Sequence, residues 1–477
     1  HQSDIKAWLT ESVKIEIEGL EEKQRKGRGG KAAEKRAEDI KKKTERLAKI
    51  AVVKRFSYNP NGDNVGYDSL NHSEVVKMGS EFIETEDTMQ DILVSKYPIL
   101  LIDESQDTKK ELVDALLTVC EKYKSRFIVG MFGDTMQRIY LDGKENLAHC
   151  IPDDWEKPKK VMNHRSATRI VQLANTIRLT IDDQQQRPRS DATKGIVRLF
   201  IASSDADKES IEKQAAGIMA EETKDVEWNE DTTYKSLILE HHMAASRFGF
   251  LDLYAPLNES KAFDTSLRDG SIFELSFLSK IISPLVRAYK ANNEFEVSRI
   301  VRQHSPLMDK RKLEKVDNQM EALHKAENAV DSLLALWNND NVPSCLAVLR
   351  SIHETGLFKL DVRVDDLLSD PTEGEPIKIM ALRNALSVSF DVLERYSAYV
   401  TDTTRFATHQ GVKGLEFPRV MVIMDDIEAK GFLFSYEKLF GAKPKTDSDI
   451  KNEEEGKDTS IMRTARLFYV ACTRAQK

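Results

Sequence analysis

The chain has 477 residues, of which 40% are hydrophobic and 31% are charged, and its formal net charge is −8. This length exceeds what a single hydrophobic core organises, so we expect several domains. The acidic balance excludes a uniformly basic nucleic-acid binder but allows a local basic groove. The sequence contains neither an apolar run of 18 residues nor a signal-peptide pattern, which argues against membrane insertion.

The cysteines are scattered, with neither pairing nor metal-ligand spacing. They are Cys120, Cys150, Cys345 and Cys472. Free thiols in a reducing compartment are therefore expected, and we place the protein in the cytoplasm (bacterial cytosol or nucleoid).

The N-terminal segment is highly charged. Residues 11–50 contain 13 Lys or Arg and 9 Asp or Glu, with few large apolar side chains after Leu20. This pattern predicts a long solvated helix, or a helical hairpin broken near Gly27–Gly30. The stretch Gly27–Ala32 imitates a phosphate-binding loop, but its spacing differs, no hydroxyl residue follows Lys31, and no apolar strand precedes it. We interpret it as a break between helices.

The run Ile99–Ile102 predicts a short, fully buried strand. Asp103 and Glu104 follow it directly, at the end of the strand where parallel sheets present their ligand sites. One carboxylate there can hold the Mg²⁺ of a nucleoside triphosphate, and its neighbour can polarise the attacking water.

A second apolar run, Phe127–Phe132, predicts another strand that ends in Gly133–Tyr140. The glycine permits a tight turn off the strand. Gln137 supplies an amide that can bond water or phosphate, and Tyr140 supplies a ring on which a base can stack. The alternative for Tyr140 is an ordinary core residue.

The middle of the chain alternates between helical and strand-like patterns. A helix is expected from Ser166, then a strand over Gly195–Ile201, a helix through residues 211–218, and a buried strand over Lys235–Glu240. The pair His241-His242 follows that strand. It lacks partners at metal-ligand spacing, so we place it at the surface or beside a nucleotide.

From residue 256 to 375 the alternation of strand and helix patterns ends. Amphipathic helices are expected there instead, as over residues 272–286 and 320–334. Pro371–Pro376 predicts a loop, and Val420–Met424 predicts another buried strand. The segment Gly441–Asp458 is charged and loop-rich, and we expect its Glu453–Gly456 portion to be mobile.

Five blocks of this sequence resemble, in order, motifs II to VI of the UvrD/Rep-type superfamily 1 DNA helicases. The blocks are Asp103–Asp107, Gly133–Tyr140, Asn163–Ser166, Thr408–Phe417 and Arg466–Ala475. Any one block is a weak or moderate signal, whereas five in the correct order make a strong one. The resemblance spans most of the chain.

The resemblance implies an α/β fold with two RecA-like motor domains of the P-loop NTPase type and mainly helical inserted domains. Residues 1–89 would be a 1B-like helical insertion and 90–162 the rest of the first motor domain. The second motor domain would comprise 163–255 and 379–477, interrupted by a helical 2B-like insertion over 256–378. In the family the basic face of domain 1B meets duplex DNA; the alternative is a charged face that contacts only water.

The resemblance also implies a role for each residue of an ATPase centre. Asp103 would bind Mg²⁺, Glu104 would activate water, and Gln137 would sense the γ-phosphate. Arg165 and Arg474 would neutralise charge on the transferred phosphoryl group, a task that suits a planar, permanently charged guanidinium.

Further residues would contact the nucleotide and DNA. Gly414 and Glu416 would belong to the nucleotide site, with Glu416 accepting a hydrogen bond from the ribose. Thr408 and His409 would touch the backbone of a single strand, and Tyr140 would stack a base.

Structural alternatives stay open for several of these residues. Arg165 could cap a helix or pair with an acid, and His409 could be an ordinary loop histidine. Arg466 is expected to have such a structural role.

The chain departs from the family in three places. The motif Gly-x-x-x-x-Gly-Lys-Ser/Thr is absent from the 477 residues. Asp142 stands where the family usually has a tryptophan that stacks on DNA, and Arg463–Ala465 stands where it favours an acidic residue. We expect that the sequence is a fragment of a longer helicase and that this segment alone does not hydrolyse ATP efficiently. A pseudo-helicase without a phosphate loop is the alternative.

The function that the resemblance implies is an ATP-dependent helicase or translocase that uses Mg²⁺ and moves 3′ to 5′ on single-stranded DNA. Single-stranded DNA, its junctions with duplex and a partner nuclease or repair protein are the expected partners, in DNA repair, recombination or phage defence. The alternative is an ATPase-deficient scaffold that binds DNA or a partner nuclease.

Overall fold

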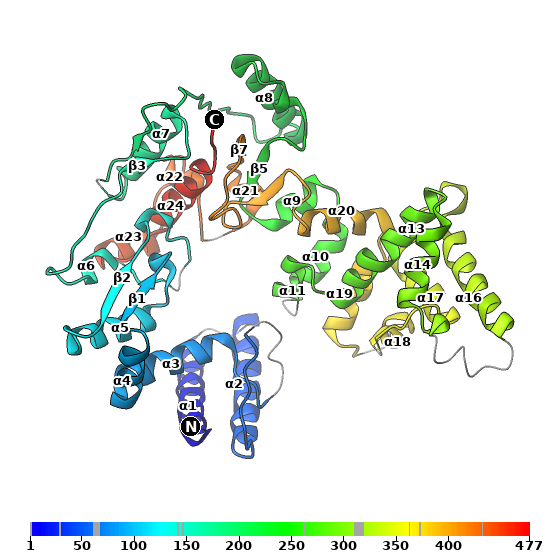
Figure 1. The fold of residues 1–477 in the computed structure, drawn as a ribbon, viewed down its shortest axis with the longest axis horizontal. Coiled ribbons are helices and arrows are strands. Elements are labelled where there is room, and N and C mark those ends of the chain that lie inside the picture. The colour runs from blue at the N-terminus through cyan, green and yellow to red at the C-terminus, as the bar shows by residue number, and fades with distance from the viewer. Residues whose placement is uncertain are drawn as a thin grey trace. The chain divides into compact units, whose positions relative to one another are not determined.

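The computed structural model describes residues 2–27, 30–60, 67–140, 143–145, 147–182, 184–260, 263–309, 319–361, 363–371, 374–431 and 433–477. The chain divides into two compact units, residues 1–157 and 158–477, which are described separately below (Figure 1). The five-part domain division expected from the sequence stays a prediction.

Unit 1 is mainly helical, with a small parallel sheet. Its elements are α1 (Gln2–Lys26), α2 (Lys31–Ile50), α3 (His72–Thr85), α4 (Asp87–Lys96), β1 (Ile99–Ile102), the 3₁₀ turn η1 (Ser105–Asp107), α5 (Lys110–Lys122), β2 (Ile128–Met131), the 3₁₀ turn η2 (Thr135–Gln137) and α6 (Leu147–Cys150). The predicted strands at 99–102 and 127–132 are confirmed.

Helices α1 and α2 form a charged hairpin, which is one of the two arrangements that the sequence predicted. They are antiparallel, because Lys6 near the start of α1 donates to the carbonyl of Ala51, while Arg36 in α2 donates to Gln24 late in α1. Gly30, at the start of α2, has φ 104°, which a residue with a side chain rarely adopts. The apolar side of the hairpin packs against α3 through Leu9, among others.

Strands β1 and β2 are parallel, with Leu101 opposite Gly130. Leu100 and Ile102 pack toward Val119 of α5, but Ile99 and Leu101 are 60% and 64% exposed. The expectation of a fully buried strand was therefore wrong for one face. Successive side chains alternate between the faces of a strand, and the described helices of this unit pack on only one of them.

The two ends of the unit 2 sequence together contain two small parallel sheets, one of two strands and one of three strands, among the described residues. Their elements are β3 (Met162–Asn163), α7 (Thr168–Arg178), β4 (Arg187–Pro188), α8 (Lys208–Thr223), η3 (Val226–Asn229), β5 (Lys235–Ile238), α9 (His241–Arg247), β6 (Phe406–Thr408), β7 (Val420–Val422), α21 (Asp426–Ala429), α22 (Tyr436–Leu439), α23 (Asp447–Glu454) and α24 (Ser460–Cys472). Strand β5 lies between β6 and β7 and is buried along its length, as predicted.

The remainder of unit 2 is helical, as expected for residues 256–375. It comprises α10 (Leu251–Glu259), α11 (Asp264–Asp269), α12 (Phe273–Phe277), the π-helical turn η4 (Leu278–Ile282), α13 (Ser283–Lys290), α14 (Glu294–His304), η5 (Pro306–Met308), α16 (Gln319–Leu334), η6 (Ala335–Asp340), α17 (Cys345–Thr355), α18 (Arg363–Leu368), α19 (Ile377–Leu386) and α20 (Phe390–Val400). Mixed helices and small parallel sheets agree with the expected α/β class.

The strand predicted over Gly195–Ile201 is not formed. Ile196 and Val197 pack into the core, but Leu199 and Ile201 are 67% and 89% exposed, and no described strand pairs with this segment. An apolar run forms a strand only where a neighbouring backbone supplies hydrogen-bond partners.

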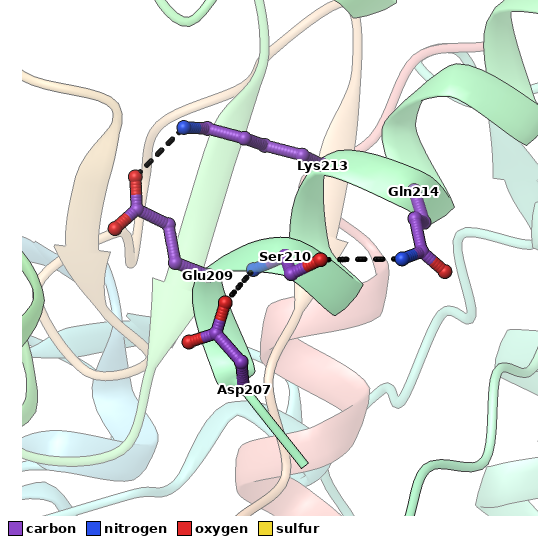
Figure 2. A pocket seen from close by; sticks show the side chains of 5 residues that line it. All are labelled: Asp207, Glu209, Ser210, Lys213 and Gln214. Atoms are coloured by element: carbon purple, nitrogen blue, oxygen red, sulfur yellow. Dashed lines mark hydrogen bonds and ion pairs between the residues drawn. The ribbon is translucent and has the colours of Figure 1, made fainter.

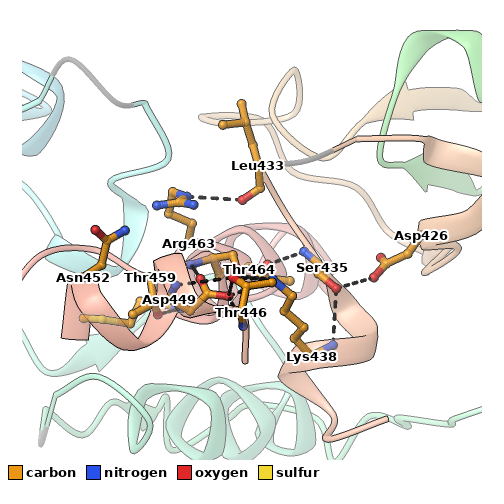
Figure 3. Close-up of polar contacts among 12 residues, drawn as sticks. Asp426, Leu433, Ser435, Lys438, Thr446, Asp449, Asn452, Thr459, Arg463 and Thr464 are labelled. Carbon is orange, nitrogen blue, oxygen red and sulfur yellow. Dashed lines mark hydrogen bonds and ion pairs between the residues drawn. The ribbon is translucent and has the colours of Figure 1, made fainter. Parts of the chain in front are cut away.

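The segment expected to be rich in loops, Gly441–Asp458, contains helix α23. The mobility expected for Glu453–Gly456 stays a prediction. Thr446 and Asp449 form a capping box at the start of α23, and the carboxylate of Asp449 also bonds Lys438 and the backbone N–H of Ser460 (Figure 3). These contacts join α22, α23 and α24. Buried, charge-assisted hydrogen bonds thus order a segment whose composition favours a loop.

The described cysteines are free thiols, as expected. Within the described ranges, no group of three or more His, Cys, Asp or Glu is placed to hold a metal ion. None of the described helices combines the length and apolar character that a membrane crossing requires.

Candidate active site

The two carboxylates of the first block lie where β1 ends. Both Asp103 and Glu104 are exposed to solvent. Asp103 accepts a hydrogen bond from the backbone N–H of Glu104 at 2.9 Å, and Glu104 has the left-handed φ of 50°. Such a φ is uncommon for a residue with a side chain and is concentrated at functional sites.

Gln106 supports this pair, and the sequence reasoning assigned it no role. Its side chain is 1% exposed, its Nε2 donates to Oε2 of Glu104, and its Oε1 accepts the backbone N–H of Asp134 at 3.2 Å. The amide therefore joins the residues that follow β1 and β2. The sequence feature that could have indicated this role is the neutral polar side chain of Gln106 within the acidic block Asp103–Asp107.

Gly133, which follows β2, leaves little room for a side chain. It does not adopt a positive φ, but a Cβ there would lie 2.1 Å from Oε1 of Gln106. Next to it, Asp134 accepts the N–H of Met136 at 3.0 Å and caps the turn that carries Gln137. The Nε2 of Gln137 lies 3.4 Å from Asp134 Oδ2.

Tyr140 is 48% exposed, so its ring is accessible and it is not a core residue. Asp142, predicted to weaken the aromatic platform, lies outside the described residues.

In unit 2, the remaining three blocks come together. Arg165 donates through Nε to Oε2 of Glu416 at 2.9 Å and through Nη1 to the carbonyl of Thr473 at 3.3 Å. The side chain of Asn163 accepts the backbone N–H groups of Arg165 and Ser166 and so fixes this turn.

Backbone hydrogen bonds connect the same blocks. The N–H of Phe417 donates to Arg474 and the N–H of Gln476 donates back to Phe417, both at 2.9 Å. Ser166 Oγ donates to the carbonyl of Ala475 at 2.9 Å, although the two residues are 309 positions apart. Sites that are distant in the sequence thus form one structural element.

Glu416 is the acid at the centre of this element. The hydrogen bond from Arg165 lowers its pKa below the usual value, with smaller contributions from Gln476 and the charge of Arg474. The pairing with an acid that the sequence left open for Arg165 is present, and the acid is the residue expected to bind the ribose.

Arg474 is 2% exposed and contacts both its own segment and the segment before Glu416. It donates to the carbonyls of Val470 at 2.9 Å and Leu415 at 3.2 Å and to Thr473 Oγ1 at 3.1 Å. In this arrangement its guanidinium fixes the motif, and direct contact with a phosphate requires a rearrangement.

The two residues of the fourth block that were predicted to bind DNA, Thr408 and His409, are both buried. Thr408 is 8% exposed, and its Oγ1 accepts the N–H of Gly411 at 3.0 Å. His409 is 0% exposed, with Nε2 3.0 Å from the carbonyl of Leu237 and Nδ1 3.0 Å from the hydroxyl of Tyr436. His409 therefore supports the loop from inside the protein and does not present its ring to a DNA strand here.

Gly414 has φ 82°, and a Cβ at this position would have no heavy atom within 4 Å. Its backbone angle, and not crowding, is what favours glycine at this position before Glu416.

Arg466 has the structural role that the sequence predicted, and His241 and His242 also have structural partners. Arg466 is 4% exposed and pairs with Asp458, which supplies the acid missing from positions 463–465. His241 contacts the hydroxyl of Tyr399 at 2.7 Å, and His242 contacts the carbonyl of Glu428.

A hollow in unit 2 lies over the first turns of α8 (Figure 2). Its lining groups bond one another, as Lys213 does with Glu209 at 2.8 Å and Gln214 does with Ser210 at 3.2 Å. It contains none of the motif residues, so we do not assign the site to it.

Asp103 fits the Mg²⁺ role that the resemblance implies. Mg²⁺ is usually held by one or two protein carboxylates together with substrate phosphates and water, so an accessible pair at a strand end is a suitable donor set. The exposed carboxylates of Asp103 and Glu104 provide it.

Comparison with known proteins shows a similarity that extends over most of the chain. The chain is 23% identical over 463 residues to Gabija protein GajB of Bacillus cereus (strain HuB5-5), covering 89% of this chain and 64% of GajB. The chain thus spans slightly less than two thirds of that relative. No protein family model matches the sequence.

Proposed function

We propose that the chain is the motor part of an ATP-dependent DNA helicase or translocase that moves 3′ to 5′ on single-stranded DNA. The observation that carries the proposal is the assembly of three distant sequence blocks around Glu416 and Arg165. The direction of movement rests only on the resemblance to the UvrD/Rep type.

In this proposal, Asp103 binds Mg²⁺ and Glu104 accepts the proton of the attacking water. Gln137 responds to the γ-phosphate, and the arginines of unit 2 stabilise the charge that develops on the phosphoryl group. Bound Mg²⁺ supplies electrostatic stabilisation of the phosphate oxygens. The loop that holds the β-phosphate is not among these residues.

The similarity to a Gabija protein leads us to propose that the protein serves a Gabija-type system. Phage defence is then the pathway that we favour over DNA repair and recombination, and a nuclease is the partner that we favour. Single-stranded DNA and its junctions with duplex are the proposed nucleic-acid ligands.

The test is ATP hydrolysis by the full-length protein, with and without single-stranded DNA. We expect DNA to stimulate turnover and Glu104→Gln to abolish it while nucleotide binding persists, because the amide cannot accept the proton. DNA binding without turnover in the unmodified protein would favour the ATPase-deficient scaffold. Unchanged turnover in Glu104→Gln would remove Glu104 from the role of base.

A further inference from the structure

Gln106 is a buried polar side chain between two loops of the site. It is 1% exposed, yet both ends of its amide are engaged, with Glu104 on one side and the backbone of Asp134 on the other. These partners follow different strands, β1 and β2, whose pairing continues past their ends through a 2.9 Å bond from Ser105 N to Phe132 O.

The chemistry of the partners determines the orientation of this amide. An ionised carboxylate only accepts hydrogen bonds, and a backbone N–H only donates. The NH₂ of Gln106 must therefore face Glu104 and its oxygen must face Asp134. A carboxylate or an apolar side chain of the same size at this position could not satisfy both partners.

The neighbouring glycine is adapted to this bridge. A Cβ on residue 133 would lie 2.1 Å from Oε1 of Gln106 and 2.9 Å from Oγ of Ser105. Side chains in folded proteins do not approach that closely, so an alanine at this position would require Gln106 or Ser105 to shift.

The residue that receives the bridge also shapes the next turn. Asp134 caps η2 through the N–H of Met136, and η2 carries Gln137 and leads to the exposed Tyr140. A shift of this turn would therefore move the Asp134 N–H and, through Gln106, the carboxylate of Glu104.

We propose that Gln106 is a positioning residue that holds Glu104 in place and couples it to the turn carrying Gln137 and Tyr140. The coupling rests on the proposed function, because it links the base for hydrolysis to the segment assigned to DNA. The bridge itself is a property of unit 1 alone. It explains why a neutral amide is buried beside an acid at this edge of the sheet.

The first test is Gln106→Met in the full-length protein, which keeps the length of the side chain and removes both hydrogen bonds. We expect DNA-stimulated kcat to fall about 10- to 100-fold, as for other residues that orient a reacting group. KM for ATP and affinity for single-stranded DNA should stay within about twofold, and the ratio of kcat with and without DNA should fall.

Gln90→Met is the matched control. Gln90 is 2% exposed in the same unit and donates to the carbonyls of Ile83 and Glu84 at 3.0 and 2.9 Å, away from the carboxylates. It should lower the unfolding midpoint without changing turnover per folded molecule. Equal losses of kcat in both variants would show a merely structural role for Gln106.

A double-mutant cycle tests the geometry further. Gly133→Ala should lower kcat by displacing Gln106, and its effect should shrink in a Gln106→Ala background, where the 2.1 Å contact is gone. Additive effects of the two changes would contradict the bridge.

Hydrogen exchange gives a readout that needs no activity. The backbone amide of Asp134 should lose protection in Gln106→Met and keep it in Gln90→Met. Unchanged protection would overturn the bridge, even if the protein proves to be a scaffold. Absence of DNA-stimulated turnover in the unmodified protein, together with normal Asp134 protection, would instead reject the proposed function and with it the coupling.

Discussion

The Nε atom of Arg165 lies 2.9 Å from Oε2 of Glu416, a residue 251 positions further along the chain. The two side chains are 31% and 51% exposed. Ion pairs that reach solvent in this way contribute little to stability, typically about 0–1 kcal/mol. The pairing of Arg165 with Glu416 is therefore better explained by a role in the site than by its contribution to the stability of the fold.

The first prediction is that Arg165→Lys separates activity from stability. Lysine keeps the charge but lacks the planar fork that contacts a phosphoryl group, so DNA-stimulated kcat should fall by about 10³-fold or more. The free energy of urea unfolding should change by less than about 1 kcal/mol. Arg198→Lys, at another exposed ion pair of unit 2, is the control and should leave both quantities unchanged. Normal turnover in Arg165→Lys would exclude a role at the phosphoryl group.

The second prediction concerns Tyr140. If its exposed ring stacks a base, Tyr140→Ala should weaken single-strand binding by about 1–3 kcal/mol, measured by fluorescence anisotropy. Tyr97→Ala is a matched control, because Tyr97 is 49% exposed against 48% for Tyr140. Equal affinity in the two variants would leave Tyr140 without a role in DNA binding.

The third prediction is an acid sensitivity caused by His409. Burial lowers its pKa from 6.5 to about 4 and outweighs the hydrogen bonds to backbone that favour the charged form. The unfolded chain therefore binds a proton that the folded protein does not, so stability should fall as the pH decreases from about 6.5 to about 4. The loss should amount to about 2–4 kcal/mol, measured by urea unfolding at each pH.

His409→Gln should remove most of this slope between pH 6.5 and 4, because glutamine does not titrate there. An unchanged slope would mean that His409 is already accessible to solvent and protons. In that case, the predicted contact with DNA would regain support.

The fourth prediction concerns Asp449, where burial alone would raise the pKa. Hydrogen bonds from Lys438, Thr446 and Ser460 outweigh burial and hold the pKa of its carboxyl well below the usual value. The stabilisation is therefore fully present above about pH 4, the ordinary value of an aspartate, and is lost as the pH falls below it.

Asp449→Asn should cost about 1–3 kcal/mol at neutral pH, since an amide replaces a charged acceptor of several hydrogen bonds. The difference between this variant and the unmodified protein should shrink below about pH 4. A difference that is independent of pH would show that packing, and not the charge of Asp449, joins α22, α23 and α24.

Local sequence patterns were sufficient for much of the fold. The apolar runs at 99–102 and 235–238 form strands, and the charged segment broken by glycines forms the α1–α2 hairpin. The missing strand at Gly195–Ile201 and the helix α23 within the loop-rich segment Gly441–Asp458 arose where non-local partners decide the outcome. The first segment finds no described strand to pair with, and the second gains a capping box and a buried acid.

By itself, the sequence determined which residues could carry chemistry, because Asp103, Glu104 and Arg165 stand at recognisable positions beside apolar runs or in ordered blocks. Only the tertiary structure decided how they are held. It buries His409 inside the protein, pairs Arg165 with Glu416 and places Gln106 beside Glu104. The physical reason is that burial and hydrogen-bond partners depend on segments brought together by packing, which local composition does not encode.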